Sequence, residues 1–110
     1  MVELAGSVHI SEAVLDYMSK LIQFTRDSKD SRLGVSVRGG LGLARAVRAW
    51  AAARGRTYVL PDDVKELAPS VLAHRIVVDA EAEFSGVTGD KIVEQAIAKV
   101  AAPQDRHQAA

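Results

Sequence analysis

LGVSVRGGLGLARAVRAWAAARG, residues 33–55, is the stretch that predicts a helix most strongly in this sequence. Ser36 is a favourable N-cap residue, and Gly55 is typical of the residue that ends a helix. At about 100° per residue, Arg38 and Arg45 lie together on one side of this helix, opposite an apolar face. We expect that face to pack into a core, and it comprises Leu43, Ala44, Val47, Trp50 and Ala51.

Arg38 stands in an unusual place for a cation. The first turn of a helix carries unpaired N–H groups and the positive end of the helix dipole, so an arginine there costs about 0.3 kcal/mol or more. Gly39, Gly40 and Gly42 follow, and each glycine weakens a helix interior by roughly 1 kcal/mol relative to alanine. Such a turn indicates a purpose other than stability.

Size and composition indicate one domain. The chain has 110 residues, 48% of them hydrophobic, which is enough for a single core. Its formal net charge of zero predicts no overall attraction to nucleic acid or membrane, and the lack of cysteine excludes disulfides and thiolate metal sites. No apolar run approaches the roughly 20 residues of a membrane span, and a signal peptide is not evident. We expect a soluble, cytoplasmic protein with a domain over residues 8–101 and disordered segments at 1–7 and 102–110.

The remaining sequence predicts an all-α bundle of four or five helices. Ser11 begins the first helix, Pro61 opens the third and Thr88 caps the last one. Pro69 is expected to break or kink the third helix, with a short second segment ending at His74. The residues predicted for the core are Val14, Met18, Leu21, Leu43, Val47, Trp50, Leu67, Leu72, Ile92 and Ile97.

Two connecting stretches predict other structure. Residues 26–32 contain no apolar side chain and are typical of a solvated loop. Residues 76–78 are β-branched and predict a small two-stranded ribbon paired with residues 58–59.

No set of residues predicts a catalytic or metal centre. The three histidines are far apart in sequence, and His74 is expected to be a partly buried structural residue. Acidic side chains alternate over residues 79–83, where a solvated connector is favoured over a cation site. The sequence lacks GxxxxGK[ST], and the glycines after Arg38 do not form GxGxxG, so this chain alone cannot hold a triphosphate in such a loop.

Two interpretations of Arg38 follow from the residues. It can be a surface arginine that tolerates its position, with the glycines allowing another helix to approach closely. Alternatively, Arg38 and the unpaired N–H groups of its turn face an anion, whose charge reverses the unfavourable dipole effect. Spacing alone favours the first interpretation.

A series of short motifs in one order favours the second interpretation. They are Thr25-Arg26, Gly34 with Ser36 and Arg38, Gly55-Arg56, Tyr58-Val59, Pro61-Asp62-Asp63-Val64, Val71-Leu72 and His74-Arg75. In this order they resemble the C-terminal lid of the MoxR family of AAA+ ATPases, over roughly residues 8–100.

The resemblance implies a nucleotide-binding role for Ser36, Val37 and Arg38. Arg38 would be the sensor-2 arginine, the one catalytic residue of this chain, and would reach the phosphates of ATP held by a preceding α/β core. The glycines of the same turn would leave room for the nucleotide. Val37 departs from the family's proline, and Leu60 departs from its capping threonine.

The same resemblance implies the cofactors and partners. The parent protein would be an ATPase that binds ATP and Mg²⁺, whereas this chain alone would bind neither and would not be catalytic. Its partners would be its own AAA+ core, the neighbouring subunits of a ring oligomer and proteins with von Willebrand A domains, but not nucleic acid or membrane. The lid would couple ATP hydrolysis to chaperone-like remodelling or maturation of partner complexes.

An alternative function is a freestanding helical adaptor or DNA-binding module. In that case Arg38, Arg45 and Arg48 would contact phosphates of the duplex, although zero net charge does not favour it. A self-sufficient enzyme is a third class, for which the sequence offers no residue set.

Overall fold

A computed structural model describes residues 8–103 of the chain. The predicted segment 1–7 and most of the predicted segment 102–110 lie outside the described residues, and Ala102 packs against the core. The elements are, in order, α2 (Glu12–Asp27), β1 (Ser31–Leu33), α3 (Val37–Ala53), α4 (Pro61–Leu72), the 3₁₀ helix η1 (Ala73–Arg75), β2 (Val77–Val78), α5 (Ala80–Phe84) and α6 (Gly89–Lys99). The predicted helical bundle with a small two-stranded ribbon is confirmed.

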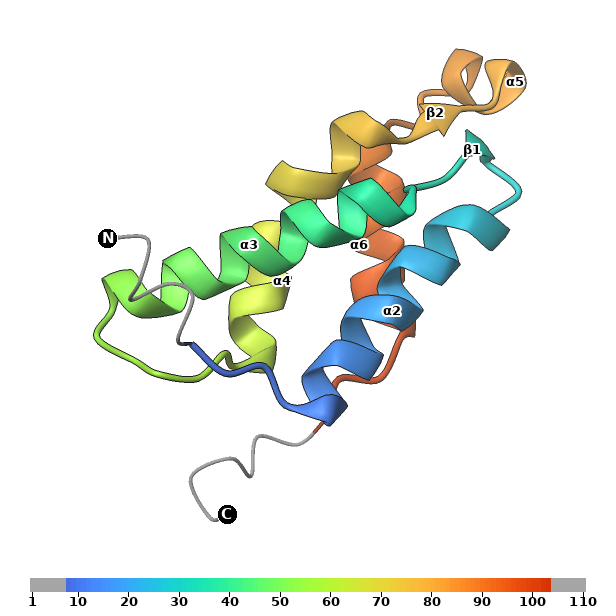
Figure 1. The fold of residues 1–110 in the computed structure, drawn as a ribbon. Helices are drawn as coiled ribbons and strands as arrows, with labels where there is room; N and C mark the ends of the chain where they lie inside the picture. Colours follow the sequence, from blue (N-terminus) through green and yellow to red (C-terminus); the bar gives the residue numbers. More distant parts are fainter. Residues whose placement is uncertain (1–7, 104–110) are drawn as a thin grey trace.

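The four longer helices pack around one apolar core. In Figure 1, α3 crosses α4 and α2 runs beside α6, and each of these pairs is in contact. Leu43, Val47 and Leu72 are fully buried, as predicted. Two other predicted core residues, Leu67 and Ile97, are half-buried and pack against the core. Trp50, also predicted for the core, is half-buried, and its ring stacks with the guanidinium of Arg54.

Three predicted N-caps are confirmed by hydrogen bonds from the backbone of the first turn. The side-chain oxygen of Ser11 accepts from the amide of Val14 at 3.2 Å, and that of Thr88 accepts from the amide of Lys91 at 3.2 Å. Ser36 caps α3 in the same way. Each cap satisfies a helix N–H that would otherwise lack a partner, so these side chains determine where the helices begin.

Pro69, where the sequence predicts a break or a kink, does not break the third helix. The helix α4 continues through Pro69 to Leu72, and η1 follows directly. The one backbone bond that this proline cannot make is to the carbonyl of Lys65, an exposed residue where water can replace it. The buried residues Ala68 and Leu72 on either side of Pro69 hold the helix against the core.

The ribbon forms, but with a different partner from the predicted one. β2 pairs antiparallel with β1, so that Leu33 is opposite Val77. The segment predicted as a solvated loop therefore contains the end of α2 and a strand. Tyr58, the expected partner, instead forms a single parallel bridge with His9. Strand pairing depends on which segments the helices bring together, and short-range patterns do not encode that.

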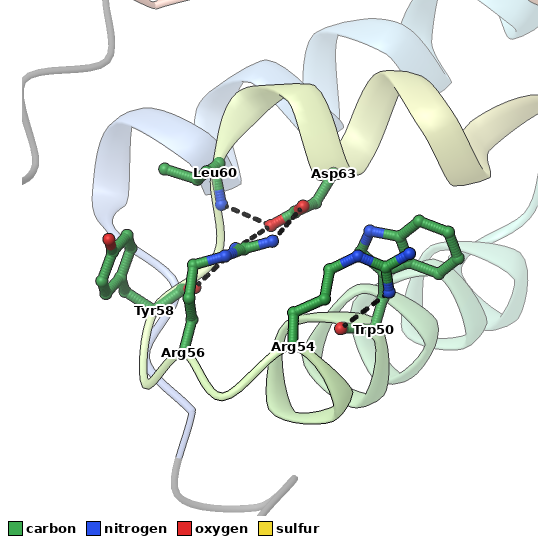
Figure 2. Close-up of polar contacts among 6 residues, drawn as sticks. All are labelled: Trp50, Arg54, Arg56, Tyr58, Leu60 and Asp63. Atoms are coloured by element: carbon green, nitrogen blue, oxygen red, sulfur yellow. Dashed lines mark hydrogen bonds and ion pairs between the residues drawn. The ribbon is translucent and has the colours of Figure 1, made fainter.

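A bidentate ion pair holds the connector between α3 and α4 (Figure 2). The two guanidinium nitrogens Nη1 and Nη2 of Arg56 donate to the carboxylate of Asp63 at 2.7 and 2.8 Å. The same carboxylate accepts from the amide of Leu60 at 2.7 Å. In a capping box, two hydrogen bonds join the N-cap residue and the third helical residue, each from a backbone amide to the other residue's side chain. Leu60 has no polar side chain, so only the bond from its amide to the Asp63 carboxylate forms here, and it compensates for the missing threonine.

Asp63 is only 4% exposed, so its charge needs these partners. Burial by itself raises the pKa of this carboxyl. The hydrogen bonds from Arg56 and Leu60, with the positive charges of Arg56 and Arg54, outweigh burial and hold the pKa below its ordinary value. The ionised form is therefore the one that the fold favours.

No helix within residues 8–103 is long and apolar enough to cross a membrane.

Candidate functional site

The first turn of α3 brings the three predicted site residues together at the surface. Ser36 has extended backbone angles, φ −82° and ψ 173°, and its hydroxyl accepts from the amide of Gly39 at 3.4 Å. Ser36, Val37 and Arg38 are all exposed, and Val37 is 75% exposed. A ligand or another domain can therefore reach this turn.

Arg38 has no protein partner within the described part of the chain. No hydrogen bond or ion pair joins its guanidinium to any of residues 8–103. The first turn of α3 contains no acidic side chain, so the unpaired N–H groups and Arg38 combine to make this end of the helix positive. Such an arrangement suits an anion with several acceptor oxygens.

The glycines of this turn have a different role from the predicted one. A Cβ at Gly39 would lie 2.5 Å from Cγ1 of Val35, and a Cβ at Gly40 would lie 3.0 Å from Cδ1 of Ile22. The space they leave is therefore filled by the protein's own side chains. The prediction that this room accommodates nucleotide is wrong for Gly39, which is buried.

The loop before α3 is fixed by the Thr25-Arg26 pair at the end of α2. The Thr25 hydroxyl donates to the carbonyl of Ile22 at 2.7 Å and accepts from the amide of Val35 at 3.1 Å. A Cβ at Gly34 would lie 2.5 Å from the Cα of Arg26, so only glycine allows this approach. Sequence analysis did not identify this role of Thr25, whose only local signal is a hydroxyl on the buried face of a helix.

An apolar groove adjoins Arg38 between α2 and α3. Its volume is about 360 Å³, and its lining includes the apolar residues Leu15, Ile22, Val37 and Leu41 together with Arg26. Leu15 is 46% exposed and Leu41 is 58% exposed. An exposed apolar groove of this kind is typical of a surface that another protein element covers.

The histidines and acidic residues considered in the sequence analysis do not form a metal site within the described residues. Within residues 8–103, no three histidine, aspartate or glutamate side chains gather closely enough to hold a metal ion. The acidic stretch 79–83, predicted as a solvated connector, forms the short helix α5 and its cap, and Glu81 and Glu83 are exposed. His74 is exposed, which corrects the expectation that it is partly buried.

The arginines of α3 do not form one continuous basic surface. Arg38 and Arg45 are exposed, but the Nε of Arg48 is buried and has no hydrogen-bond partner among the described residues. A recognition helix needs a row of accessible polar side chains. This geometry gives no support to DNA binding.

Comparisons with known proteins agree with the fold. Residues 23–96 match the family described as AAA lid domain. The chain is 32% identical to the chaperone MoxR1 of Mycobacterium tuberculosis over 111 residues, which cover 93% of this chain and 29% of that protein. It is 36% identical to the protein YeaC of Bacillus subtilis over 100 residues, covering 91% of this chain and 31% of YeaC.

A solved structure has the same fold. The crystal structure of a Cytophaga hutchinsonii protein, proposed to be an ATPase, superimposes with a TM-score of 0.86 at 32% identity and covers 93% of this chain and 34% of that one. The chain therefore belongs to the AAA lid domains, and its relatives place it with the lids of MoxR-family AAA+ ATPases. It spans about a third or less of the length of these relatives.

Proposed function

We propose that this lid closes over ATP bound to an AAA+ core and that Arg38 contacts the terminal phosphate. The single observation that carries the proposal is an exposed arginine without a partner among residues 8–103, at the positive end of α3. A guanidinium stays protonated and offers several fixed donors to phosphate oxygens. Its contact is lost when the terminal phosphate leaves, so hydrolysis changes the free energy of the closed lid.

Ser36 and Val37 support Arg38 from the same turn. Ser36 fixes the start of the helix through its bond to Gly39, and the first N–H groups of the helix point toward the same anion. ATP and Mg²⁺ are bound mainly by the core, and the lid adds the charged contact of Arg38. The chain alone is therefore not an ATPase.

The groove between α2 and α3 is the surface that we assign to the core. It lies next to Arg38 and shares Ser36 and Val37 with the phosphate-facing turn. Covering the exposed Leu15 and Leu41 would favour closure by about 25 cal/mol for each Å² of apolar surface removed from water. Nucleotide and core would then be engaged by one continuous face.

In the parent protein, closure of the lid would be coupled to remodelling of partner complexes. One relative of this chain is named a chaperone. Ring assembly with neighbouring subunits and partners with von Willebrand A domains belong to the same proposal. In a ring, a change of lid angle in one subunit moves the next, which is how hydrolysis could do mechanical work on a partner.

Replacing Arg38 in the full-length ATPase tests the proposal. We expect Arg38→Ala to lower ATP turnover by about tenfold to a hundredfold, because a charge-assisted bond to the transferred phosphate is lost. Arg54→Ala is the matched control, since Arg54 stacks on Trp50 at the other end of α3, 3.4 Å from the ring centroid. Turnover of the Arg38 variant equal to that of the native protein would refute the proposal.

A further inference from the structure

A second guanidinium lies beside the first turns of α3. The side chain of Arg75, from η1, extends along the helix from Gly39 to Gly42. Its Cδ lies 3.1 Å from the position that a Cβ would take at Gly39, and its Nη2 lies 3.7 Å from the corresponding position at Gly42. Arg75 itself is exposed, so its charged end remains at the surface.

Packing determines this position. Leu72 is fully buried and Ile76 is only 7% exposed, so the backbone on both sides of Arg75 is anchored in the core. The absence of a side chain at Gly39 leaves a passage in which the methylene groups of Arg75 lie directly on α3. An alanine at Gly39 would narrow that passage, because 3.1 Å is closer than ordinary van der Waals contact.

The charged side chains that α3 places near Arg75 are all positive. Arg38 precedes Gly42 by four residues and Arg45 follows it by three, so both lie on the side of the helix where the Arg75 guanidinium ends. Residues 37–53 include no acidic side chain. Within the part of the chain that the structure describes, no hydrogen bond or ion pair joins Arg75 to another residue. Like charges at this spacing repel, and an anion would offset the repulsion.

We propose that Arg75 is a second phosphate-binding residue of the lid, which acts with Arg38 on the polyphosphate of ATP held by the core. This inference rests on the function proposed above. The Arg75 guanidinium ends near Gly42, about one helical turn along α3 from residue Arg38, and the phosphates of one nucleotide can contact both side chains. Because Arg75 comes from η1, nucleotide would join the end of α4 to the start of α3.

The experiment uses the full-length ATPase that contains this lid. Affinity for a fluorescent ATP analogue and the steady-state constants for ATP are measured for Arg75→Ala, Arg75→Lys, Arg38→Ala and the control Arg54→Ala. We expect Arg75→Ala to raise the KM for ATP by about five- to tenfold, as expected for the loss of one partly exposed charge-assisted contact. Lysine keeps the positive charge but lacks the fixed pair of guanidinium N–H donors, so the affinity of Arg75→Lys should lie between those of Arg75→Ala and the native protein.

The outcomes separate this inference from the proposed function. If Arg38→Ala lowers turnover and Arg75→Ala leaves KM and analogue affinity unchanged, the role of Arg75 is refuted and that of Arg38 stands. If neither variant changes nucleotide affinity or turnover, the proposed function itself fails.

Two further results would also overturn the role of Arg75. One is a lower melting temperature for Arg75→Ala with no loss of affinity for the analogue, which would make the residue structural. The other is weaker association of lid and core without nucleotide, at unchanged nucleotide affinity, which would assign Arg75 to a carboxylate of the core. Loss of nucleotide affinity with an unchanged melting temperature, and partial recovery by lysine, would confirm the inference.

Discussion

At the scale of single residues, the glycines after Arg38 differ in what surrounds them. Gly39 is enclosed by Val35 and Arg75, whereas a Cβ at Gly42 would meet only the far end of the Arg75 side chain at an ordinary contact distance of 3.7 Å. Sequence alone treats these positions as equivalent, because helix propensity is a local property. Their neighbours come from distant parts of the chain and give each glycine a different consequence.

Alanine at these two positions should have opposite effects on stability. Gly42→Ala should raise the free energy of unfolding by about 0.5–1 kcal/mol, because alanine restricts the unfolded chain and fits the available space. Gly39→Ala should lower it by about 1–2 kcal/mol, since the new methyl group would lie 2.5 Å from Val35 Cγ1. Urea unfolding followed by circular dichroism measures both. Equal stabilisation by the two variants would contradict this description of the turn.

At the scale of elements, the Arg56–Asp63 pair ties the connector after α3 to the start of α4. The pair links the connector to the first turn of α4 and is supported by the Leu60 amide (Figure 2). Its residues belong to the motifs Gly55-Arg56 and Pro61-Asp62-Asp63-Val64, whose order was visible in the sequence. The sequence did not show that Arg56 and Asp63 are in contact, because an ion pair between residues seven apart depends on the path of the connector.

Asp63→Asn should lower the free energy of unfolding by about 2–3 kcal/mol near neutral pH, because it removes the negative charge that accepts two hydrogen bonds from the largely buried guanidinium of Arg56. Asp62→Asn is the matched control, as Asp62 is the exposed neighbour in the same turn. Thermal or urea unfolding of the two variants measures the difference. Similar stabilities of the two would show that the ion pair contributes little.

The same carboxyl predicts how stability depends on pH. The pKa of Asp63 is lower in the folded chain than its ordinary value of 3.8. The stabilisation by its charge is therefore fully present above that value, and it is lost as pH falls through the lower folded pKa. The free energies of unfolding of the native chain and of Asp63→Asn, measured at a series of pH values, should therefore converge as the pH falls through this acidic range. A difference that stays constant down to the acid transition would contradict the assignment.

At the scale of the whole molecule, the start of α3 combines charge with exposed apolar surface. The groove beside α2 shares Ser36 and Val37 with this turn, and the Arg75 side chain lies over Gly39 and Gly42 of the same helix. The core lies between α2, α3, α4 and α6, whose arrangement is shown in Figure 1. A lid needs this combination, because it must be stable by itself and still bind a second domain reversibly.

Leu41→Gln should weaken docking of the lid on the core and leave the stability of the lid nearly unchanged. Leu41 is 58% exposed, so the free energy of unfolding should change by no more than about 0.5 kcal/mol. In the full-length ATPase the change should weaken closure and lower turnover by about threefold to tenfold, since apolar surface in the groove is replaced by an amide. Ala49→Gln, at an exposed position of the same helix, is the control. Native turnover in the Leu41 variant would exclude the groove as the docking surface.

Much of the architecture could be predicted because its signals are local. The caps at Ser11, Ser36 and Thr88 each bind an amide three residues away. The apolar periodicity of the helices identified several buried core residues, Leu43, Val47 and Leu72 among them. The motif order identified the lid family, and Arg38 was singled out as a cation at the wrong end of a helix. These features depend on neighbours in sequence, so the amino-acid order alone was enough to find them.

The pairing of β1 with β2, the continuity of α4 through Pro69 and the placement of Arg75 over Gly39 required the folded chain. Each depends on residues that are brought together by packing of the helices, or on whether a lost hydrogen bond faces water or core. Local propensities contain neither kind of information, because burial and long-range contact arise only when the whole bundle assembles.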